Sequence, residues 1–136
     1  MTLKVLSIDH LVLNVHDVEL SADWYGRALG MSRKDQTPPN GGLPRTSLLF
    51  GSQKINLRPT DASPAEWFTG RTPRAGSDDL CFLVDVPPET VASHLAALGI
   101  DIEQGPVTKR GARGPIVSVY CRDPDGNVIE LSSYIR

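Results

Sequence analysis

The alternation of apolar and polar residues predicts the same series of elements twice along this chain. Runs over 9–15 (DHLVLNV) and 78–84 (DDLCFLV) are rich in β-branched and apolar residues, which is typical of strands. A helix-like segment follows each run, over 15–30 and over 87–99, and both segments end in Ala-Leu-Gly, 69 positions apart. Such repetition indicates two related units.

The ends of the two helices carry recognisable signals. Asp17 is a predicted N-cap and Gly30 a predicted stop, whereas the second helix begins at Pro87-Pro88 and ends at Gly99. Three further strands are predicted in each half, over 31–36, 45–50 and 54–58, and over 101–107, 116–122 and 128–135. Short polar turns join the last two strands of each set and predict hairpins, the second through Asp-Pro-Asp-Gly-Asn.

The order βαβββ, found twice, predicts an α+β fold. We expect one domain of two modules, about 3–60 and 77–136, joined by a linker over 61–76, because 136 residues suffice for one core but not for two independent enzymatic domains. Trp67 and Phe68 lie in the linker, so part of it is expected to fold back as a lid or short helix. The loop 37–44 (TPPNGGLP) is expected to be mobile.

Composition narrows the class of partner. The chain has 14 basic and 16 acidic residues without a block of Lys and Arg, which gives no electrostatic footprint for nucleic acid or a membrane surface. We therefore expect a small-molecule partner. No apolar run reaches the roughly 20 residues of a membrane span, and no secretory signal pattern is present, so we expect a cytoplasmic protein. Cys81 and Cys121 lie in apolar runs and are expected to be reduced core thiols.

Four polar side chains fall on strand faces that oppose the predicted core. Side chains alternate between the two faces of a strand, so the apolar positions fix which polar residues point the other way. This places His10 and Asn56 in the first half, and Asp79 and Glu130 in the second, at corresponding positions. If each module curls its mixed sheet around this open face, two modules enclose a cavity into which all four side chains point.

An imidazole and two carboxylates form a common ligand set for Mn, Fe, Ni, Co or Zn, usually with open positions for water and substrate. His10 and Glu130 are the strongest candidate ligands and Asp79 is a third. Asn56 is a poor ligand for these metals and is expected to bind a water or a substrate oxygen. Taken singly, each residue has a simpler alternative: a hydrogen-bonded structural histidine, a solvated glutamate, and an aspartate that caps a turn. The agreement between the two halves favours the metal site.

Other polar residues share the open face of the predicted strands. An arginine there can hold a substrate carboxylate or phosphate through two hydrogen bonds, and the alternative is a solvated charge at a strand end. His16 and His94 are expected to be surface or packing residues. The further candidates for substrate binding are Arg58, Ser118, Tyr120 and Arg122.

Three stretches carry a resemblance to a known family. They are Asp9-His10-Leu11, the segment from Trp24-Tyr25 to Leu29-Gly30-Met31, and the segment from Gly114-Pro115-Ile116 through the Asp-Pro-Asp-Gly-Asn turn to Glu130. With the duplicated βαβββ plan, the sequence resembles the vicinal oxygen chelate superfamily, also called the glyoxalase/bleomycin-resistance/dioxygenase fold, over essentially its whole length. It looks most like the small glyoxalase-domain-containing proteins.

The resemblance implies a homodimer and a divalent metal held by side chains from the first and last strands of the modules. Those positions are occupied by His10, Asn56, Asp79 and Glu130. Glyoxalase I normally supplies four ligands of the types His, Gln and Glu, so Asn56 and Asp79 depart from its pattern. Extradiol dioxygenases need two histidines and one carboxylate on iron, and here Asp79 replaces the second histidine.

The leading interpretation is therefore a metal-dependent lyase or isomerase of the glyoxalase type, acting on a small oxygenated substrate. His10, Asp79 and Glu130 would hold the metal while two adjacent substrate oxygens take its open positions. Glu130, or a hydroxide on the metal, would then move the proton. An extradiol-type dioxygenase and a metal-free protein that binds a small molecule such as an antibiotic stay open as alternatives.

Overall fold

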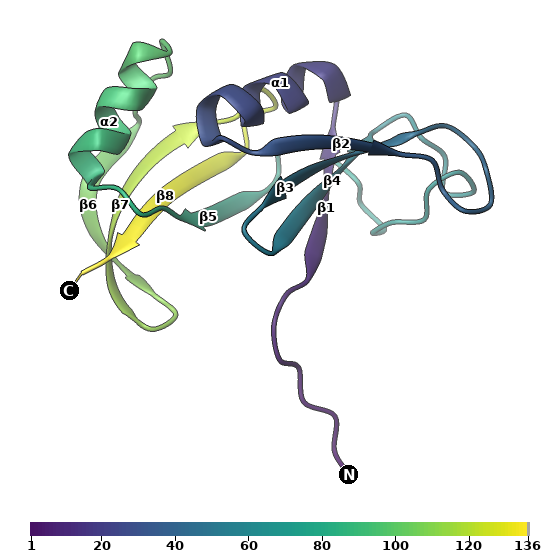
Figure 1. The fold of residues 1–136 in the computed structure, drawn as a ribbon, viewed down its shortest axis with the longest axis horizontal. Coiled ribbons are helices and arrows are strands. Elements are labelled where there is room, and N and C mark those ends of the chain that lie inside the picture. Colours follow the sequence, from purple (N-terminus) through teal and green to yellow (C-terminus); the bar gives the residue numbers. More distant parts are fainter. Residues whose placement is uncertain (136) are drawn as a thin grey trace. The chain divides into compact units, whose positions relative to one another are not determined.

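The computed structural model describes residues 1–135, so Arg136, the last residue of the second predicted module, lies outside the described residues. The chain divides into two compact units, Met1–Arg74 and Ala75–Arg136. Each unit contains one four-stranded mixed sheet and one helix (Figure 1). The α+β class and the order βαβββ, repeated twice, are confirmed.

Unit 1 holds the elements β1 (His10–Val15), α1 (Val18–Leu29), β2 (Ser32–Gln36), β3 (Arg45–Phe50) and β4 (Gln53–Pro59). Its sheet has the order β1-β4-β3-β2, with β1 parallel to β4 and the other neighbours antiparallel. Helix α1 lies over one face of this sheet and contacts β2, β3 and β4 (Figure 1). The opposite face, which carries His10 and Asn56, is the open face of unit 1.

Both predicted ends of α1 are confirmed. The Asp17 side chain accepts a hydrogen bond of 3.0 Å from the backbone N–H of Leu20, which satisfies a donor that the helix itself leaves unpaired. Gly30 ends the helix at φ 69°, a left-handed conformation that glycine adopts without a steric penalty. The helix buries Trp24, Tyr25 and Ala28 against Leu13, Leu48, Ile55 and Leu57 of the sheet, which form the core of this unit.

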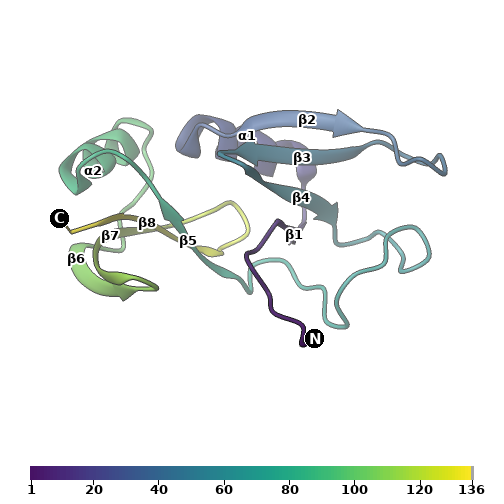
Figure 2. The same cartoon turned by 60° about the horizontal axis from the view of Figure 1, so that its bottom comes forward.

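Unit 2 repeats this arrangement with β5 (Asp79–Leu83), α2 (Pro88–Ala97), β6 (Gln104–Gly111), β7 (Gly114–Arg122) and β8 (Val128–Tyr134). The sheet order is β5-β8-β7-β6, again with the first pair parallel. Figure 2 shows α2 over one face of this sheet. Val91 and Leu95 of α2 pack with Val119, Cys121 and Ile129 in the core. The face with Asp79 and Glu130 is the open face of unit 2.

The position of one strand was predicted wrongly. The strand expected over 101–107 is β6, which starts at Gln104 and runs to Gly111, and β7 begins at Gly114 rather than at 116. The two strands form a hairpin in which Gly111 faces Gly114. Only Val107 and Gly111 of β6 are even half-buried, so the strand has no buried apolar face that alternation could reveal.

The expectation for the cysteines was half wrong. Cys121 is buried, with 1% of its surface exposed, but Cys81 is exposed on the open face of β5. Both are free thiols. The parity of β5 already put Cys81 opposite Leu80 and Phe82, so its apolar neighbours in sequence were a poor guide to its burial.

The linker folds back onto unit 1 as a series of turns, without a helix. Trp67 is buried and Phe68 is 89% exposed, so only the first of the two aromatic residues anchors the segment. The Ser63 carbonyl accepts hydrogen bonds from the N–H groups of Glu66 and Trp67. The segment from Pro59 to Trp67 therefore forms a wall beside the end of the sheet.

The turn between β7 and β8, which was predicted at Asp-Pro-Asp-Gly-Asn, is held by buried polar groups. Asp123 Oδ1 accepts from the N–H groups of Asp125 and Asn127, and Asn127 Nδ2 donates to Asp123 Oδ2 at 2.7 Å. Asn127 Oδ1 in turn accepts from the N–H of Asp78 at 2.8 Å. This network fixes the start of β5 against the start of β8 and so sets the register that positions Asp79 and Glu130.

Candidate functional site

The two open faces show the same register at the candidate residues. In unit 1, Asn56 of β4 lies opposite Val12, two residues after His10. In unit 2, Glu130 of β8 lies opposite Cys81, two residues after Asp79. The predicted correspondence of His10 with Asp79, and of Asn56 with Glu130, therefore holds strand by strand. Within each unit, the candidates belong to two adjacent parallel strands.

Glu130 is held by hydroxyl groups on the open face of unit 2. Ser118 Oγ donates to Glu130 Oε2 at 2.6 Å, and Ser132 Oγ donates to the same oxygen at 3.3 Å. The two hydroxyls lie 2.7 Å apart, and both serines are buried. Because both contacts are to Oε2, the other carboxylate oxygen, Oε1, accepts from neither serine.

Tyr120 and Cys81 lie on either side of Glu130 in the sheet, since Glu130 is the register partner of both. Burial, reinforced by the Glu130 carboxylate, raises the pKa of the Tyr120 phenol to about 12. Burial is also the main cause that raises the pKa of the Cys81 thiol, and the charges of Glu130 and Asp79 add to it. Both groups are thus kept protonated near neutral pH, and the negative charge of this face stays on its carboxylates.

His10 is oriented by its neighbour in sequence. Its Nδ1 lies 2.8 Å from Asp9 Oδ2, and an ionised carboxylate can only accept here, so Nδ1 carries the proton. In the neutral ring Nε2 then has the free lone pair, which is the state that a metal ligand needs. The His10 side chain is 44% exposed.

The candidate ligands are divided between the units, with His10 in unit 1 and Asp79 and Glu130 in unit 2. Over residues 1–135, the structure shows no group of three or more His, Cys, Asp or Glu side chains arranged to hold a metal ion. The donor set itself, one imidazole nitrogen and two carboxylates, fits the chemistry of Mn, Fe, Ni, Co or Zn.

Arg58 was expected either to bind a substrate anion or to be a solvated charge at a strand end, and the structure shows neither arrangement. It is 1% exposed, so it is no solvated charge, and its guanidinium donates to three groups of unit 1. Nε donates to the Trp67 carbonyl at 3.1 Å, NH2 to the Ala62 carbonyl at 2.7 Å, and NH1 to Asn14 Oδ1 at 3.0 Å. The structure therefore gives Arg58 a structural role, in which it ties the linker to β1 and β4.

Two other candidates for substrate binding also have partners within unit 2. Arg122 donates to both carboxylate oxygens of Glu103, at 2.6 and 3.3 Å, and to the Gly126 carbonyl. Ser118 has no exposed surface and contacts Glu130. Asn56 and Tyr120 are half-buried and Arg122 is exposed, so these three of the expected substrate-binding residues have side chains that reach the open faces.

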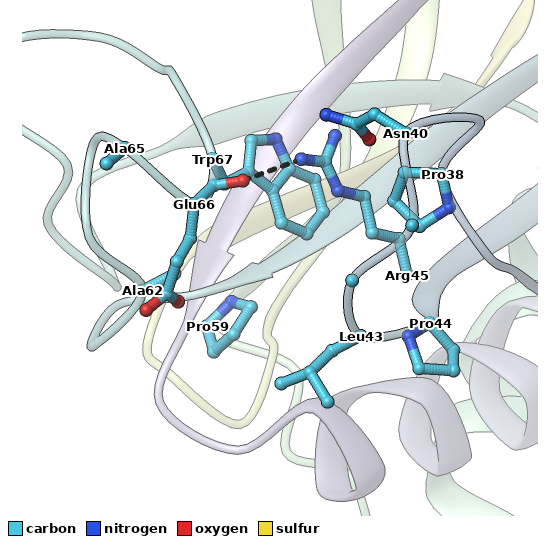
Figure 3. Close-up of a pocket in the computed structure, with 12 residues that line it drawn as sticks. Pro38, Asn40, Leu43, Pro44, Arg45, Pro59, Ala62, Ala65, Glu66 and Trp67 are labelled. Carbon is cyan, nitrogen blue, oxygen red and sulfur yellow. Dashed lines mark hydrogen bonds between the residues drawn. The ribbon is translucent and has the colours of Figure 1, made fainter.

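Unit 1 contains two cavities that share Pro38 and Arg45. The larger, of about 500 Å³, lies between the loop 38–44 and the linker, with Pro59, Leu43 and Trp67 among its walls (Figure 3). The smaller, of about 210 Å³, lies on the open face and is lined by Arg45, Ser47, Lys54 and Asn56 together with residues 36–39. The sequence-based prediction missed Arg45, although its place two residues before Ser47 in an alternating strand puts both on one face.

Arg45 is fixed between the two cavities. Its guanidinium lies over the Trp67 ring, 4.1 Å from the ring centre, and NH2 donates to the Glu66 carbonyl at 2.9 Å (Figure 3). Over residues 1–135 the guanidinium contacts an aromatic ring and a backbone carbonyl, so its charge has no carboxylate partner there. A cation is thereby held at the end of the open face of unit 1.

The chain is similar to proteins of known sequence over nearly its whole length. It is 45% identical to the glyoxalase domain-containing protein RDO1 of Mycosarcoma maydis over 134 residues, which cover 97% of this chain and 70% of that protein. It is 42% identical to the virulence protein STM3117 of Salmonella typhimurium, over 94% of this chain and 84% of that protein.

Solved structures are also similar to this chain over nearly its whole length. VPC_CASS1, from the mobile metagenome of V. Pseudocholerae, is 38% identical, covers both chains completely and superposes with a TM-score of 0.91. At the level of fold alone, the chain is also similar to lactoylglutathione lyase from Agrobacterium tumefaciens, with a TM-score of 0.70, and to the antibiotic-binding protein TnmS3 from Streptomyces sp. CB03234, with a TM-score of 0.74.

The family model that matches this chain covers residues 7–131, a range that includes all eight strands except the last residues of β8. The resemblance seen in the sequence is thus confirmed together with the fold. The chain belongs to the Glyoxalase/Bleomycin resistance protein/Dioxygenase superfamily.

Proposed function

We propose that this protein is a divalent-metal-dependent lyase or isomerase of the glyoxalase type, acting on a small oxygenated substrate. The observation that carries the proposal is that hydrogen bonds from neighbouring groups orient two candidate metal ligands, His10 and Glu130. His10 Nδ1 bonds to Asp9, which leaves Nε2 free, and Glu130 Oε2 bonds to two hydroxyls, which leaves Oε1 free of both. Partners of this kind orient metal ligands and fix their protonation.

His10, Asp79 and Glu130 are the proposed ligands, and Mn, Fe, Ni, Co and Zn are the candidate metals. The proposal requires donors from both units, supplied by one chain or by the two chains of a homodimer. When bound, such an ion polarises substrate oxygens and stabilises the negative charge that develops when a proton leaves the neighbouring carbon.

The chain's own residues account for the proton transfer. The Glu130 carboxylate is the proposed base. Its neighbours Ser118, Ser132 and Tyr120 carry hydroxyl groups that stay protonated, so they orient the carboxylate without adding a positive charge beside it. Asn56 is the proposed donor to a substrate oxygen. Its Oδ1 accepts from Ser47 Oγ at 2.7 Å, so Nδ2 is the group that faces a ligand.

Exchange of a substrate proton for deuterium tests the proposed activity. Hydroxyacetone, which carries two adjacent oxygens, would be incubated with the metal-loaded protein in D₂O and followed by NMR. We expect exchange that stops on metal removal and falls by about 10²–10⁴ in Glu130→Gln. Oxygen uptake with a catechol under Fe(II) would instead identify a dioxygenase. Absence of both reactions, with tight binding of small molecules to the metal-free protein, would identify a binding protein.

A further inference from the structure

We propose that the open face of unit 1 carries a carboxylate-binding subsite formed by Arg45, Lys54 and Asn56, and that the substrate is therefore a small carboxylate. The inference rests on the proposed function for what happens to this substrate, but the subsite itself is argued from the contacts of unit 1 alone.

The strand register places the three donors around one spot. On this face Ser47 pairs with Asn56, Lys54 pairs with Leu49 two residues further along β3, and Arg45 lies two residues from Ser47 in the other direction. The two cations therefore lie on either side of the Ser47–Asn56 pair. All four side chains line the same cavity of about 210 Å³, which is about seven times the ~30 Å³ that a water molecule occupies in the liquid.

The chemistry of this cavity favours an anion. Asn56 Oδ1 is already occupied by the Ser47 hydroxyl, so Asn56 presents its Nδ2 hydrogens. Lys54 and Arg45 can only donate. No carboxylate is among the side chains that line this cavity in the described part of the chain. Glu66 lines the adjoining cavity, but Arg45 contacts its backbone carbonyl, and Figure 3 shows its carboxylate turned away from the guanidinium.

A carboxylate fits better than a phosphate. The guanidinium of Arg45 and the amide of Asn56 are planar donors, which match the planar, two-oxygen carboxylate group. The usual backbone features of phosphate sites, a helix N-terminus or a glycine-rich nest in front of it, do not line this cavity.

The subsite also lies beside a proposed metal ligand. Lys54 is the register partner of His10 in the parallel pair of β1 and β4, and adjacent strands are about 4.8 Å apart. A molecule with its carboxylate on Lys54 and Asn56 thus has its next few atoms within reach of His10. This spacing suits a substrate whose oxygens are separated from the carboxylate by one or two carbon atoms.

Calorimetric titration of the metal-free protein tests the subsite. The probes are malate, its neutral diamide malamide, and inorganic phosphate. We expect malate to bind more tightly than either of the others, and Lys54→Met and Arg45→Gln each to weaken malate binding about tenfold or more. Lys34→Met is the matched control, because Lys34 is an exposed cation that pairs with Ser47 on the same face but does not line the cavity.

The inference is overturned if malate binds no more tightly than malamide or phosphate, or if Lys54→Met and Lys34→Met have equal effects. Its failure can be told from failure of the proposed function by a second titration, with Mn²⁺. His10→Ala is expected to abolish Mn²⁺ binding and to retain malate binding in the metal-free protein, whereas Lys54→Met is expected to do the reverse. Malate binding that depends on Lys54, without any Mn²⁺ binding, would support the carboxylate subsite and contradict the proposed metal-dependent function.

Discussion

Ser118 Oγ donates a hydrogen bond of 2.6 Å to Glu130 Oε2, and the serine itself has no exposed surface. Ser118, which was expected to contact substrate, thus contacts Glu130, the proposed base and metal ligand. A buried hydroxyl in this place fixes the orientation of a carboxylate without adding charge.

Ser118→Ala should therefore weaken metal binding. We expect about a tenfold loss in metal affinity, because the carboxylate loses its main orienting partner. The free energy of unfolding should fall by about 1–2 kcal/mol, since Glu130 Oε2 loses its shorter hydrogen bond from a buried hydroxyl. Metal titration and urea denaturation measure the two effects. An unchanged affinity would show that Ser118 serves only the fold of unit 2.

Ser21→Ala should have the opposite effect on stability. Ser21 is 1% exposed in α1, and within residues 1–135 its hydroxyl oxygen has no hydrogen-bond partner. Alanine removes this buried polar group and is the better helix former, so we expect a gain of about 0.5–1 kcal/mol. Thermal denaturation of Ser21→Ala beside Ser118→Ala checks the sign. A loss of stability would mean that the hydroxyl has a partner, such as a water molecule.

Arg58→Met should release the linker from unit 1. The substitution leaves the Ala62 and Trp67 carbonyls and Asn14 Oδ1 without their donor, and we expect a loss of about 2–4 kcal/mol. Chymotrypsin should then cleave faster after Trp67, which is buried in the intact protein. Equal rates of cleavage in variant and wild type would show that the linker is held by other contacts.

The control for this substitution is Arg27→Met. Arg27 forms an exposed ion pair with Asp23 one helical turn away, at 2.8 Å. Exposed pairs of this kind contribute little, so we expect a change of less than about 0.5 kcal/mol and no change in cleavage.

The phenol of Tyr120 gives the fold a pH dependence. Burial first, then the hydrogen bond to Glu130 and the charge of that carboxylate, raise its pKa to about 12 in the folded state, against an ordinary value near 10. The folded state therefore keeps a proton that the unfolded state loses, so the stabilisation is complete below about pH 10 and is lost as the pH rises towards 12. Tyr120→Phe should remove this part of the alkaline loss of stability.

Absorbance at the phenolate band measures the same group directly. We expect Glu130→Gln to bring the pKa of Tyr120 part of the way back towards its ordinary value, because burial remains. Tyr134→Phe is the control among the three tyrosines of the chain. A Tyr120 that titrates near pH 10 in the wild type would contradict the position of the phenol beside Glu130.

Much of the fold could be predicted from the sequence because local signals and burial agree there. Asp17 caps α1, Gly30 ends it, and strands with one buried face show clear alternation. The hairpin of β3 and β4 turns at Gly51, whose φ of 52° suits glycine. The bounds of β6 were predicted wrongly because nearly all of its side chains are exposed. Its hydrogen bonds to β7, rather than an apolar pattern, define this strand.

The candidate site could be predicted less fully. Parity placed His10, Asn56, Asp79 and Glu130 on the correct faces, since it depends only on neighbouring core residues. It could not show that Arg58 is buried, because the partners that satisfy its guanidinium come from turns of the linker that have no periodic pattern. The subsite at Arg45 depends on the same linker, through Trp67 and Glu66.

The metal content of the folded protein tests the central claim most directly. Wild type and the variants His10→Ala and Glu130→Ala would be purified anaerobically, incubated with Mn, Fe, Ni, Co and Zn in turn, dialysed and analysed by atomic emission. His16→Ala is the control, because His16 is exposed and lies outside the proposed ligand set. We predict about one metal ion per chain in wild type and His16→Ala, and a large loss in the other two variants. A folded wild type that retains none of these metals would contradict the account.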